Sequence, residues 1–358
     1  MEFENKEVVN RPLVSVIIPI YNVGTTIYRM IECLEQQTFQ MFELILVNDG
    51  STDESEEICK TIIRNHQNYY LYSKENQGAF SARNLGIEKA NGAYLTFLDA
   101  DDKIDSNYLE ILFHNCMGTD IAVCDVAVYK EDTEISRFTG GNQKITQTQA
   151  LNKLLVRKEI NSGPCGKMFS QKIIEEVRFP FLRVYEDILF VLECFCKVRE
   201  ITVTDKTTYY YMQEDTGTMG RMAKSPSVDI IAATEKIMDF IADRRDLSEE
   251  CTYITISHLY QYALPVAIQN NYRGCEFILK TQILYRKYME QILKCKAMPW
   301  KEKVIFYLYA HGYVYTNKFI KKYKGERENY EQNIYVCSWG KWKSWMRGNC
   351  TFYIKNFK

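Results

Sequence analysis

Three short apolar runs in the first part of the chain each end abruptly in a cluster of polar side chains. They are Val14 to Ile18, Phe42 to Val47 and Ala93 to Leu98. Continuous apolar runs of this length, rich in β-branched residues, are typical of parallel strands buried on both faces. Helical patterns separate the runs, so strand and helix alternate along the chain. This alternation predicts an α/β fold around an open, mainly parallel sheet.

The polar clusters fall where such a sheet binds its ligands. In an open parallel sheet the ligand crevice lies beyond the carboxyl ends of the strands. The side chains expected there are Pro19, Tyr21 and Asn22 after the first run, Asp49 and Ser51 after the second, and Asp99, Asp101 and Asp102 after the third. Three separate turns at one crevice predict a nucleotide, with base and ribose at the first two turns and phosphate at the third.

The third cluster, Asp99 to Asp102, is the most acidic. Three carboxylates at the end of a buried strand repel one another in a medium of low dielectric constant, which favours a cation between them. Hard oxygen ligands suit Mg²⁺ or Mn²⁺ that carries a diphosphate. The alternative is that Asp101 and Asp102 only cap a following helix, because Asp is a favourable N-cap. These residues alone leave both interpretations open.

Two common phosphate-binding motifs are absent from the chain. No GxGxxG follows the first strand and no GxxxxGK[ST] occurs anywhere. A dinucleotide cofactor and a P-loop NTPase are therefore disfavoured. Phosphate must then be neutralised by a metal ion and a basic side chain. The candidate is Arg83, in a helix expected from about Ala79 to Ala90, behind a loop that begins at Asn76.

Charge is balanced over the whole chain but not along it. The 358 residues contain 45 Lys and Arg against 46 Asp and Glu, which argues against a surface built for nucleic acid. From Lys294 to Lys358, however, fourteen Lys and Arg stand against four Glu. We expect this segment to be the part that meets a polyanion or an anionic membrane surface.

Twelve scattered cysteines without a CxxC pair, and the absence of a signal peptide, indicate reduced thiols of a cytosolic protein. No apolar stretch is long enough to span a bilayer. The sequence therefore predicts a cytoplasmic protein, soluble or peripheral on the inner face of the cell membrane.

Four blocks of sequence together resemble the inverting family 2 glycosyltransferases, which have the GT-A fold. The blocks are SVIIPIYN from Ser15, ILVNDGSTD from Ile45, NQGAFSARNLGIEKANGAYLTFLDADD from Asn76 and YEDILF from Tyr185. They occur in the order and spacing of that family, and the resemblance covers about residues 12 to 215. It is closest to bacterial enzymes that build capsular, exopolysaccharide or wall glycans.

The resemblance implies a role for each polar side chain at the crevice. Tyr21 would flank the nucleotide base, and Asp49 would accept a hydrogen bond from the imide N–H of uracil. Cytosine lacks that donor, so a UDP-sugar is the expected substrate. The other residues expected to bind the donor nucleotide are Pro19, Asn22, Ser51, Asn76, Arg83 and Asp99.

Metal and sugar contacts also follow from the resemblance. Asp101 would bind a Mn²⁺ or Mg²⁺ ion that bridges the diphosphate, and Asp99 would touch the ribose or the ion's water shell. Contacts with the donor or acceptor sugar are expected from Asp102, from Lys167 in the loop 161–167, and from Arg221 in a lid over residues 213–222.

The second acidic centre is Glu186 and Asp187, at the start of an apolar helical pattern. In the family, the second acid of this pair is the general base, a position that Asp187 occupies. The alternative is that both acids only favour the start of a helix. An inverting displacement needs such a base on the acceptor hydroxyl, while a metal ion stabilises the leaving diphosphate.

Beyond the resemblance, residues 223–358 are expected to form a helical accessory region. The expected order is a flexible N-terminus over residues 1–11, a GT-A domain over 12–222, and then helices at about 228–242, 251–269, 275–293 and 301–323. The basic terminus carries Trp339, Trp342 and Trp345, a composition that suits an anionic lipid surface. The alternative is a helical domain that packs its aromatic residues inward or forms a homodimer.

The predicted activity is transfer of a hexose or N-acetylhexosamine from a UDP-sugar to a hydroxyl of a glycan acceptor, which would be lipid-linked. One alternative is an idle sugar-nucleotide-binding module, but such a module would lose the base at Asp187. A nucleotidyltransferase is the other, although its basic, glycine-rich loop is missing where PIYN stands.

Overall fold

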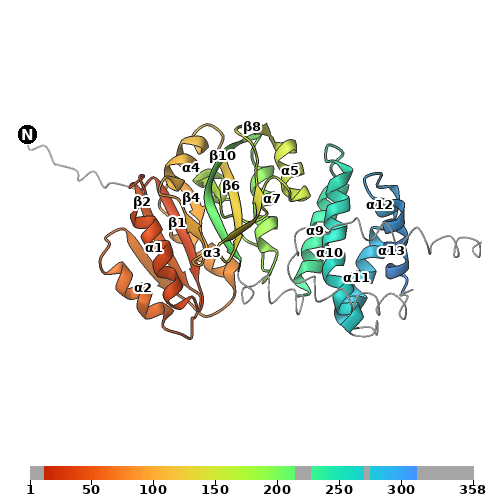
Figure 1. The fold of residues 1–358 in the computed structure, drawn as a ribbon, viewed down its shortest axis with the longest axis horizontal. Coiled ribbons are helices and arrows are strands. Elements are labelled where there is room, and N and C mark those ends of the chain that lie inside the picture. The colour runs from red at the N-terminus through yellow and green to blue at the C-terminus, as the bar shows by residue number, and fades with distance from the viewer. Residues whose placement is uncertain (1–11, 214–226, 270–274, 313–358) are drawn as a thin grey trace, which may run out of the picture. The chain divides into compact units, whose positions relative to one another are not determined.

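The computed structural model describes residues 12–213, 227–269 and 275–312 (Figure 1). Three predictions lie outside these ranges: the flexible N-terminus, the lid with Arg221, and the basic aromatic C-terminus. The described residues belong to one compact unit of the chain. Within it, the predicted mainly parallel α/β sheet is present and is followed by helices.

The first half of the sheet is entirely parallel. Its strands lie in the order β3-β2-β1-β4, with Val14 of β1 aligned to Phe42 of β2 and to Tyr94 of β4. The strands are β1 (Val14–Ile20), β2 (Phe42–Asn48), β3 (Tyr69–Ser73) and β4 (Tyr94–Phe97), and the helices between them are α1 (Ile27–Glu35), α2 (Ser55–Ile63) and α3 (Ala79–Lys89). Both faces of β1 and β2 are buried, as the continuous apolar runs predicted.

Close packing of α3 on β1 depends on glycine. A Cβ atom added to Gly86 would lie 2.4 Å from Cγ2 of Ile17, and one added to Gly92 would lie 2.6 Å from the backbone nitrogen of Ser15. Both glycines therefore let the helix and the turn after it approach the central strand. This packing sets the position of Arg83, which lies on α3.

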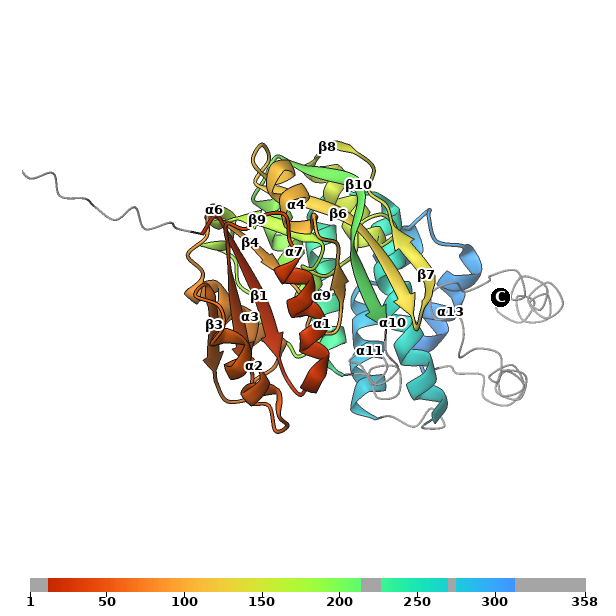
Figure 2. The same ribbon diagram turned by 60° about the vertical axis from the view of Figure 1, so that its left-hand side comes forward.

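The second half of the sheet is mixed (Figure 2). The order continues from β4 through β9, β6 and β10 to β5, with β6 and β10 parallel and β9 antiparallel to both of its neighbours. The strands are β5 (Lys103–Ile104), β6 (Ile121–Lys130), β7 (Thr133–Phe138), β8 (Gln143–Thr146), β9 (Lys167–Ser170) and β10 (Glu200–Gln213).

Helices cover this half of the sheet. They are α4 (Tyr108–Cys116), α5 (Gln147–Val156), α6 (Gln171–Ile174) and α7 (Glu186–Cys196). Thr146 and Gln149 form a capping box at the start of α5, each side chain bonding to the other's backbone N–H. Helix α7 is almost wholly apolar after its first two residues, and it is buried along its length.

Five helices follow β10 in the described part of the chain. They are α9 (Asp229–Ala242), α10 (Glu249–Gln269), α11 (Glu276–Lys287), α12 (Met289–Lys294) and α13 (Trp300–Ala310). The predicted helix at 275–293 is in fact two, because the chain breaks at Tyr288, whose hydroxyl donates to Asp239 on α9. The predicted helix from Lys301 ends at Ala310, two residues before Gly312 with its φ of +76°.

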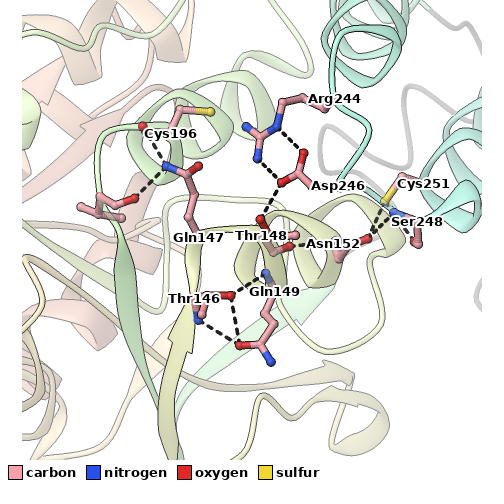
Figure 3. Close-up of polar contacts among 11 residues, drawn as sticks. Thr146, Gln147, Thr148, Gln149, Asn152, Cys196, Arg244, Asp246, Ser248 and Cys251 are labelled. Atoms are coloured by element: carbon pink, nitrogen blue, oxygen red, sulfur yellow. Dashed lines mark hydrogen bonds and ion pairs between the residues drawn. The ribbon is translucent and has the colours of Figure 1, made fainter.

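Polar contacts join the turn between α9 and α10 to helix α5 (Figure 3). The Asp246 carboxylate accepts a hydrogen bond from the Thr148 hydroxyl at 2.5 Å and pairs with Arg244 at 2.6 Å. Asn152 accepts a hydrogen bond from the backbone N–H of Ser248 at 2.8 Å. Together with one apolar cluster that includes side chains of both regions, these contacts attach the helical region to the sheet domain.

None of the described helices is long and apolar enough to cross a membrane. The ten cysteines among the described residues carry free thiols, as predicted from their scattered positions. Most of them are buried in apolar surroundings.

Candidate active site

Asn22 and Ser51 tie the ends of β1 and β2 together. Asn22 has a φ of +52°, and its backbone N–H donates to the Ser51 hydroxyl at 3.1 Å. Its side-chain oxygen accepts a hydrogen bond from the backbone N–H of Thr52 at 2.8 Å. Tyr21 is left 48% exposed beside this link, while Pro19 still belongs to β1. The first two predicted turns therefore do meet at one edge of the sheet.

Asp49 organises the loop that leads into α3. Its buried carboxylate accepts hydrogen bonds from Lys74 Nζ at 2.8 Å and from the backbone N–H of Gly78 at 2.7 Å. It also accepts a hydrogen bond from the backbone N–H of Gln77. Asn76 is exposed at the same loop, close against Gly50. The carboxylate oxygens therefore already shape the loop, and the hydrogen bond from a uracil N–H stays a prediction.

The acids of the third cluster point to different places. Asp102 is fully buried, where it accepts hydrogen bonds from the Tyr209 hydroxyl and from the backbone N–H of Met212 at 2.8 Å. Burial, with Asp99 and Asp101 nearby, raises the pKa of Asp102 well above its usual range. Its side chain therefore anchors β10, which corrects the prediction that it contacts a sugar.

The helix-cap alternative for Asp101 and Asp102 is wrong. The two-residue strand β5 follows them, and helix α4 begins only after Asn107, without a side-chain cap. Asp99 and Asp101 are both half-exposed at the strand end.

Arg83 bridges the two acidic centres. One guanidinium nitrogen is 2.9 Å from Asp99 Oδ1 and the other is 3.0 Å from Glu186 Oε1. The Arg83 side chain is only 8% exposed, and its guanidinium lies 5.5 Å from the ring centre of Phe179. Both ends of the guanidinium therefore hold carboxylates. The contact of Arg83 with phosphate stays a prediction.

Glu186 and Asp187 occupy the first turn of α7 but face different surroundings. Glu186 is buried, and burial, with a smaller contribution from Asp187, raises its pKa to about 7 although Arg83 opposes the shift. Asp187 is half-exposed and accepts a hydrogen bond from the backbone N–H of Ile188 at 2.7 Å. Asp187 therefore directly follows Glu186, which Arg83 links to Asp99, and its carboxylate is not confined to the interior.

Lys167 supports the loop that passes beside Asp187. Its side chain is fully buried, and Nζ donates to Asn161 O at 2.9 Å, Asn161 Oδ1 at 2.6 Å and Gly163 O at 2.6 Å. A Cβ atom on Gly163 would lie 3.6 Å from Asp187 Oδ2. Burial lowers the pKa of Lys167 to about 7. The prediction that Lys167 lines the sugar site is corrected, because its three donors are used inside the protein.

The carboxylates at the end of β4 can supply only some of the ligands of a divalent ion. In the described ranges, no group of three or more His, Cys, Asp or Glu side chains is arranged to hold a metal. Asp99 and Asp101 are the two half-exposed carboxylates. Mg²⁺ is commonly bound through one or two carboxylates, its remaining ligands being waters and substrate phosphates. A site of Asp101 and Asp99 completed by a diphosphate therefore fits the residues present.

The Arg83 bridge and the burial of Asp102 were not predicted. Arg83 and Glu186 are 103 positions apart, and Tyr209 is 107 positions from Asp102. Helical spacing cannot reveal such pairs. The one available signal was charge: an arginine with no acid three or four positions away in its helix, and a helix that begins with two acids.

Comparison with known proteins agrees with this architecture. The model of glycosyl transferase family 2 matches residues 15–178. An uncharacterized glycosyltransferase of Haemophilus influenzae is 33% identical over 201 residues, which cover 53% of this chain and 75% of that protein. The chain therefore belongs to glycosyl transferase family 2.

Two longer proteins extend the comparison. Glycosyltransferase GlyA of Streptococcus pneumoniae is 25% identical over 368 residues, covering 90% of this chain but only 51% of GlyA, so the chain spans about half of that relative. Crystal structures of Staphylococcus aureus TarS 1-349 with UDP and with UDP-GlcNAc cover 90% of this chain at 19% identity, with TM-scores of 0.64 and 0.62. The aligned residues make up 92% and 93% of those two TarS chains. The GT-A fold prediction is confirmed.

Proposed function

We propose that this chain transfers a hexose or an N-acetylhexosamine from a UDP-sugar to a hydroxyl of a glycan acceptor, with inversion at the anomeric carbon. The observation that carries the proposal is the Arg83 bridge, which brings the strand-end acids and the first turn of α7 to one guanidinium. A single displacement needs residues that stabilise the leaving group and, beside them, a residue that acts as the base. The TarS complexes with UDP and UDP-GlcNAc support a UDP-sugar donor.

The donor would lie along the carboxyl edge of β1, β2 and β4. Tyr21 is exposed for stacking on a base, and the Asn22–Ser51 link holds the turn that carries it. Asp49 would act mainly through the loop at Asn76, which it shapes through its hydrogen bonds to Gln77 and Gly78. In this proposal residues 12–222 are the catalytic domain and residues 223–358 are an accessory region.

A Mn²⁺ or Mg²⁺ ion would be held by Asp101, with Asp99 as a second ligand or as a partner of the ion's water shell. When bound, such an ion stabilises the negative charge of the departing diphosphate. Arg83 would act here by orienting the Asp99 carboxylate, which it holds at 2.9 Å. It would at the same time keep Glu186 in place on the opposite side of the bridge.

Asp187 would be the general base. It is half-exposed at the N-terminus of α7, next to a loop at Gly163 that has no side chain to block it. An acceptor hydroxyl becomes a competent nucleophile only when a positioned group takes its proton. Glu186 would assist by position, because its carboxyl is buried against Arg83.

We further propose that the acceptor is a lipid-linked oligosaccharide of surface polysaccharide synthesis, and that the enzyme is peripheral on the inner face of the cell membrane. The support is the charge of the segment from Lys294 to Lys358, with fourteen Lys and Arg against four Glu. Flotation of the full chain with vesicles of anionic and of neutral lipid tests this. Binding to both kinds, or to neither, would contradict an electrostatic attachment.

The activity is tested by UDP release from a panel of UDP-hexoses and UDP-N-acetylhexosamines in Mn²⁺, with and without a chelator. We expect slow hydrolysis of one member of the panel, abolished by chelation and by Asp187→Asn. UDP binding without release from any sugar would instead indicate an idle sugar-nucleotide-binding module. No binding of UDP at all would reject the donor class.

A further inference from the structure

Tyr185, the residue directly before Glu186 and Asp187, has a backbone conformation that large side chains rarely adopt. Its φ is +63° and its ψ is 14°, in the left-handed helical region. Tyr185 is also the N-cap of α7, so this turn sets the direction in which the two acids enter the helix. Such a conformation persists only where the surrounding structure holds it, and it is found most often at functional sites.

Side chains from two other helices hold Tyr185. Its hydroxyl is 2.7 Å from Nε2 of His258 on α10. The ring meets those of His258 and Tyr262, also on α10, edge to face with centroids 5.6 Å and 6.4 Å away. The guanidinium of Arg157, the C-cap of α5, is 5.7 Å from the ring centre. The anchor of this turn therefore comes largely from the helical region and not from the sheet.

The hydrogen bond joins two uncharged groups at neutral pH. Burial and the nearby Arg157 lower the pKa of His258 well below its ordinary value, and burial raises the pKa of Tyr185. The imidazole is therefore neutral while the phenol keeps its proton. The tautomer of His258 sets which of the two donates, and a side chain without a polar atom at position 258 breaks the bond.

We propose that His258 and Tyr185 are a positioning pair, by which helix α10 fixes the first turn of α7 and so the carboxylate of Asp187. The inference rests on the proposed role of Asp187 as the base. Neither member of the pair touches the reacting atoms. The helical region thus takes part in the reaction through one part-buried hydrogen bond, in addition to its apolar packing.

Four variants separate this role from general stability. Tyr185→Phe removes the hydroxyl, His258→Leu removes the ring nitrogens, and the double variant removes both. His258→Gln keeps an amide that can donate or accept, without the imidazole ring. The matched control is a second His–Tyr pair at the opposite ends of the strands, where His66 stacks on Tyr69 at 4.1 Å; it is tested by His66→Leu and Tyr69→Phe.

Two measurements are made on the full chain. Hydrogen exchange of the backbone amides at residues 186–189 reports the order of the first turn of α7. UDP release from the UDP-sugar that the panel identifies gives kcat and KM in Mn²⁺. In His258→Leu and Tyr185→Phe we expect exchange there to be ~10-fold faster and kcat to be ~10-fold lower, with KM for the donor within about twofold.

The pattern among the variants completes the test. The double variant is expected to lose no more than either single variant, because the same bond is broken in each. His258→Gln is expected to recover most of kcat and of the protection from exchange. The control variants at His66 and Tyr69 are expected to leave both quantities at residues 186–189 unchanged.

Several results would overturn the proposal. They are unchanged exchange at residues 186–189, unchanged kcat despite faster exchange while Asp187→Asn is inactive, or equal losses in His258→Gln and His258→Leu. A failure of the proposed function looks different: the wild type releases no UDP from any sugar, or Asp187→Asn is as active as the wild type. In that case the exchange result still decides whether the pair holds the first turn of α7.

Discussion

The two acidic centres of this protein share one design but differ in the partner of the buried acid. In each centre, one carboxyl is buried and its chain neighbour is half-exposed: Asp102 beside Asp101, and Glu186 beside Asp187. Asp102 is met by neutral donors from β10. Glu186 is met by the cation of Arg83.

This difference shows what each buried acid contributes. Asp102, with a raised pKa and no cation, is a local anchor that ties its turn to strand β10. Glu186 instead connects its centre to the other one, because Arg83 also holds Asp99. Asp102 bonds to the backbone of Met212, whereas Glu186 bonds to a side chain, and in both pairs the neighbour is the half-exposed acid.

The largest effect is expected from Asp187→Asn, which leaves the shape of the second centre intact and removes its base. We expect kcat for UDP release to fall by ~10²–10⁴, while the affinity for UDP stays unchanged. Turnover near the wild-type rate would mean that the half-exposed acid of this centre is not the base. The isosteric change at its buried neighbour, Glu186→Gln, should lower kcat less.

Arg83→Met tests the link between the centres. It leaves the buried Glu186 without its cation, so we expect a loss of unfolding free energy on the order of 3 kcal/mol, measured by denaturant titration. Adding Glu186→Gln to this variant should restore part of the loss. Arg178→Met, at an exposed arginine, is the control. A loss as small as that of the control would show that the bridge is not what holds the centres together.

Asp101→Ala and Asp102→Asn compare the two neighbours of the strand-end centre. We expect Asp101→Ala to weaken Mn²⁺-dependent binding of UDP by ~10-fold or more, since a divalent ion held by one or two carboxylates loses a main ligand. Asp102→Asn should keep that dependence, because the side chain is buried away from the site. Calorimetry with Mn²⁺ and with a chelator measures both, and equal behaviour of the two variants would refute the division of roles.

The smallest effect is a pH dependence of stability that comes from Glu186. Its folded-state pKa of about 7 is above the ordinary 4.5, so between these values the unfolded chain releases a proton that the folded protein keeps. The stabilisation is complete below the lower value and is lost as the pH rises through the upper one. Relative to Glu186→Gln, the wild type should lose on the order of 2 kcal/mol between about pH 5 and pH 8.

A suitable control for this titration is Glu193→Gln, at an exposed position of the same helix. A pH profile of Glu186→Gln relative to the wild type that matches the profile of this control would show that burial does not shift the Glu186 carboxyl.

Local sequence patterns predicted much of the fold. The apolar runs at Val14 and Phe42 became central parallel strands, as predicted. One misplaced helix end has a tertiary cause. The helix after Cys275 breaks at Tyr288, where a hydroxyl bonds to Asp239 from another helix.

The sequence by itself determined the order of strands and helices, the edge at which the polar turns gather, and the family to which the chain belongs. Each of these depends on residues close together in the chain, where spacing and residue type limit the conformation. Only the tertiary structure decided which acid of each pair is buried, that Lys167 supports a loop from within, and that Arg83 joins Asp99 to Glu186. Such pairings are set by the packing of elements far apart in the sequence, so no local pattern encodes them.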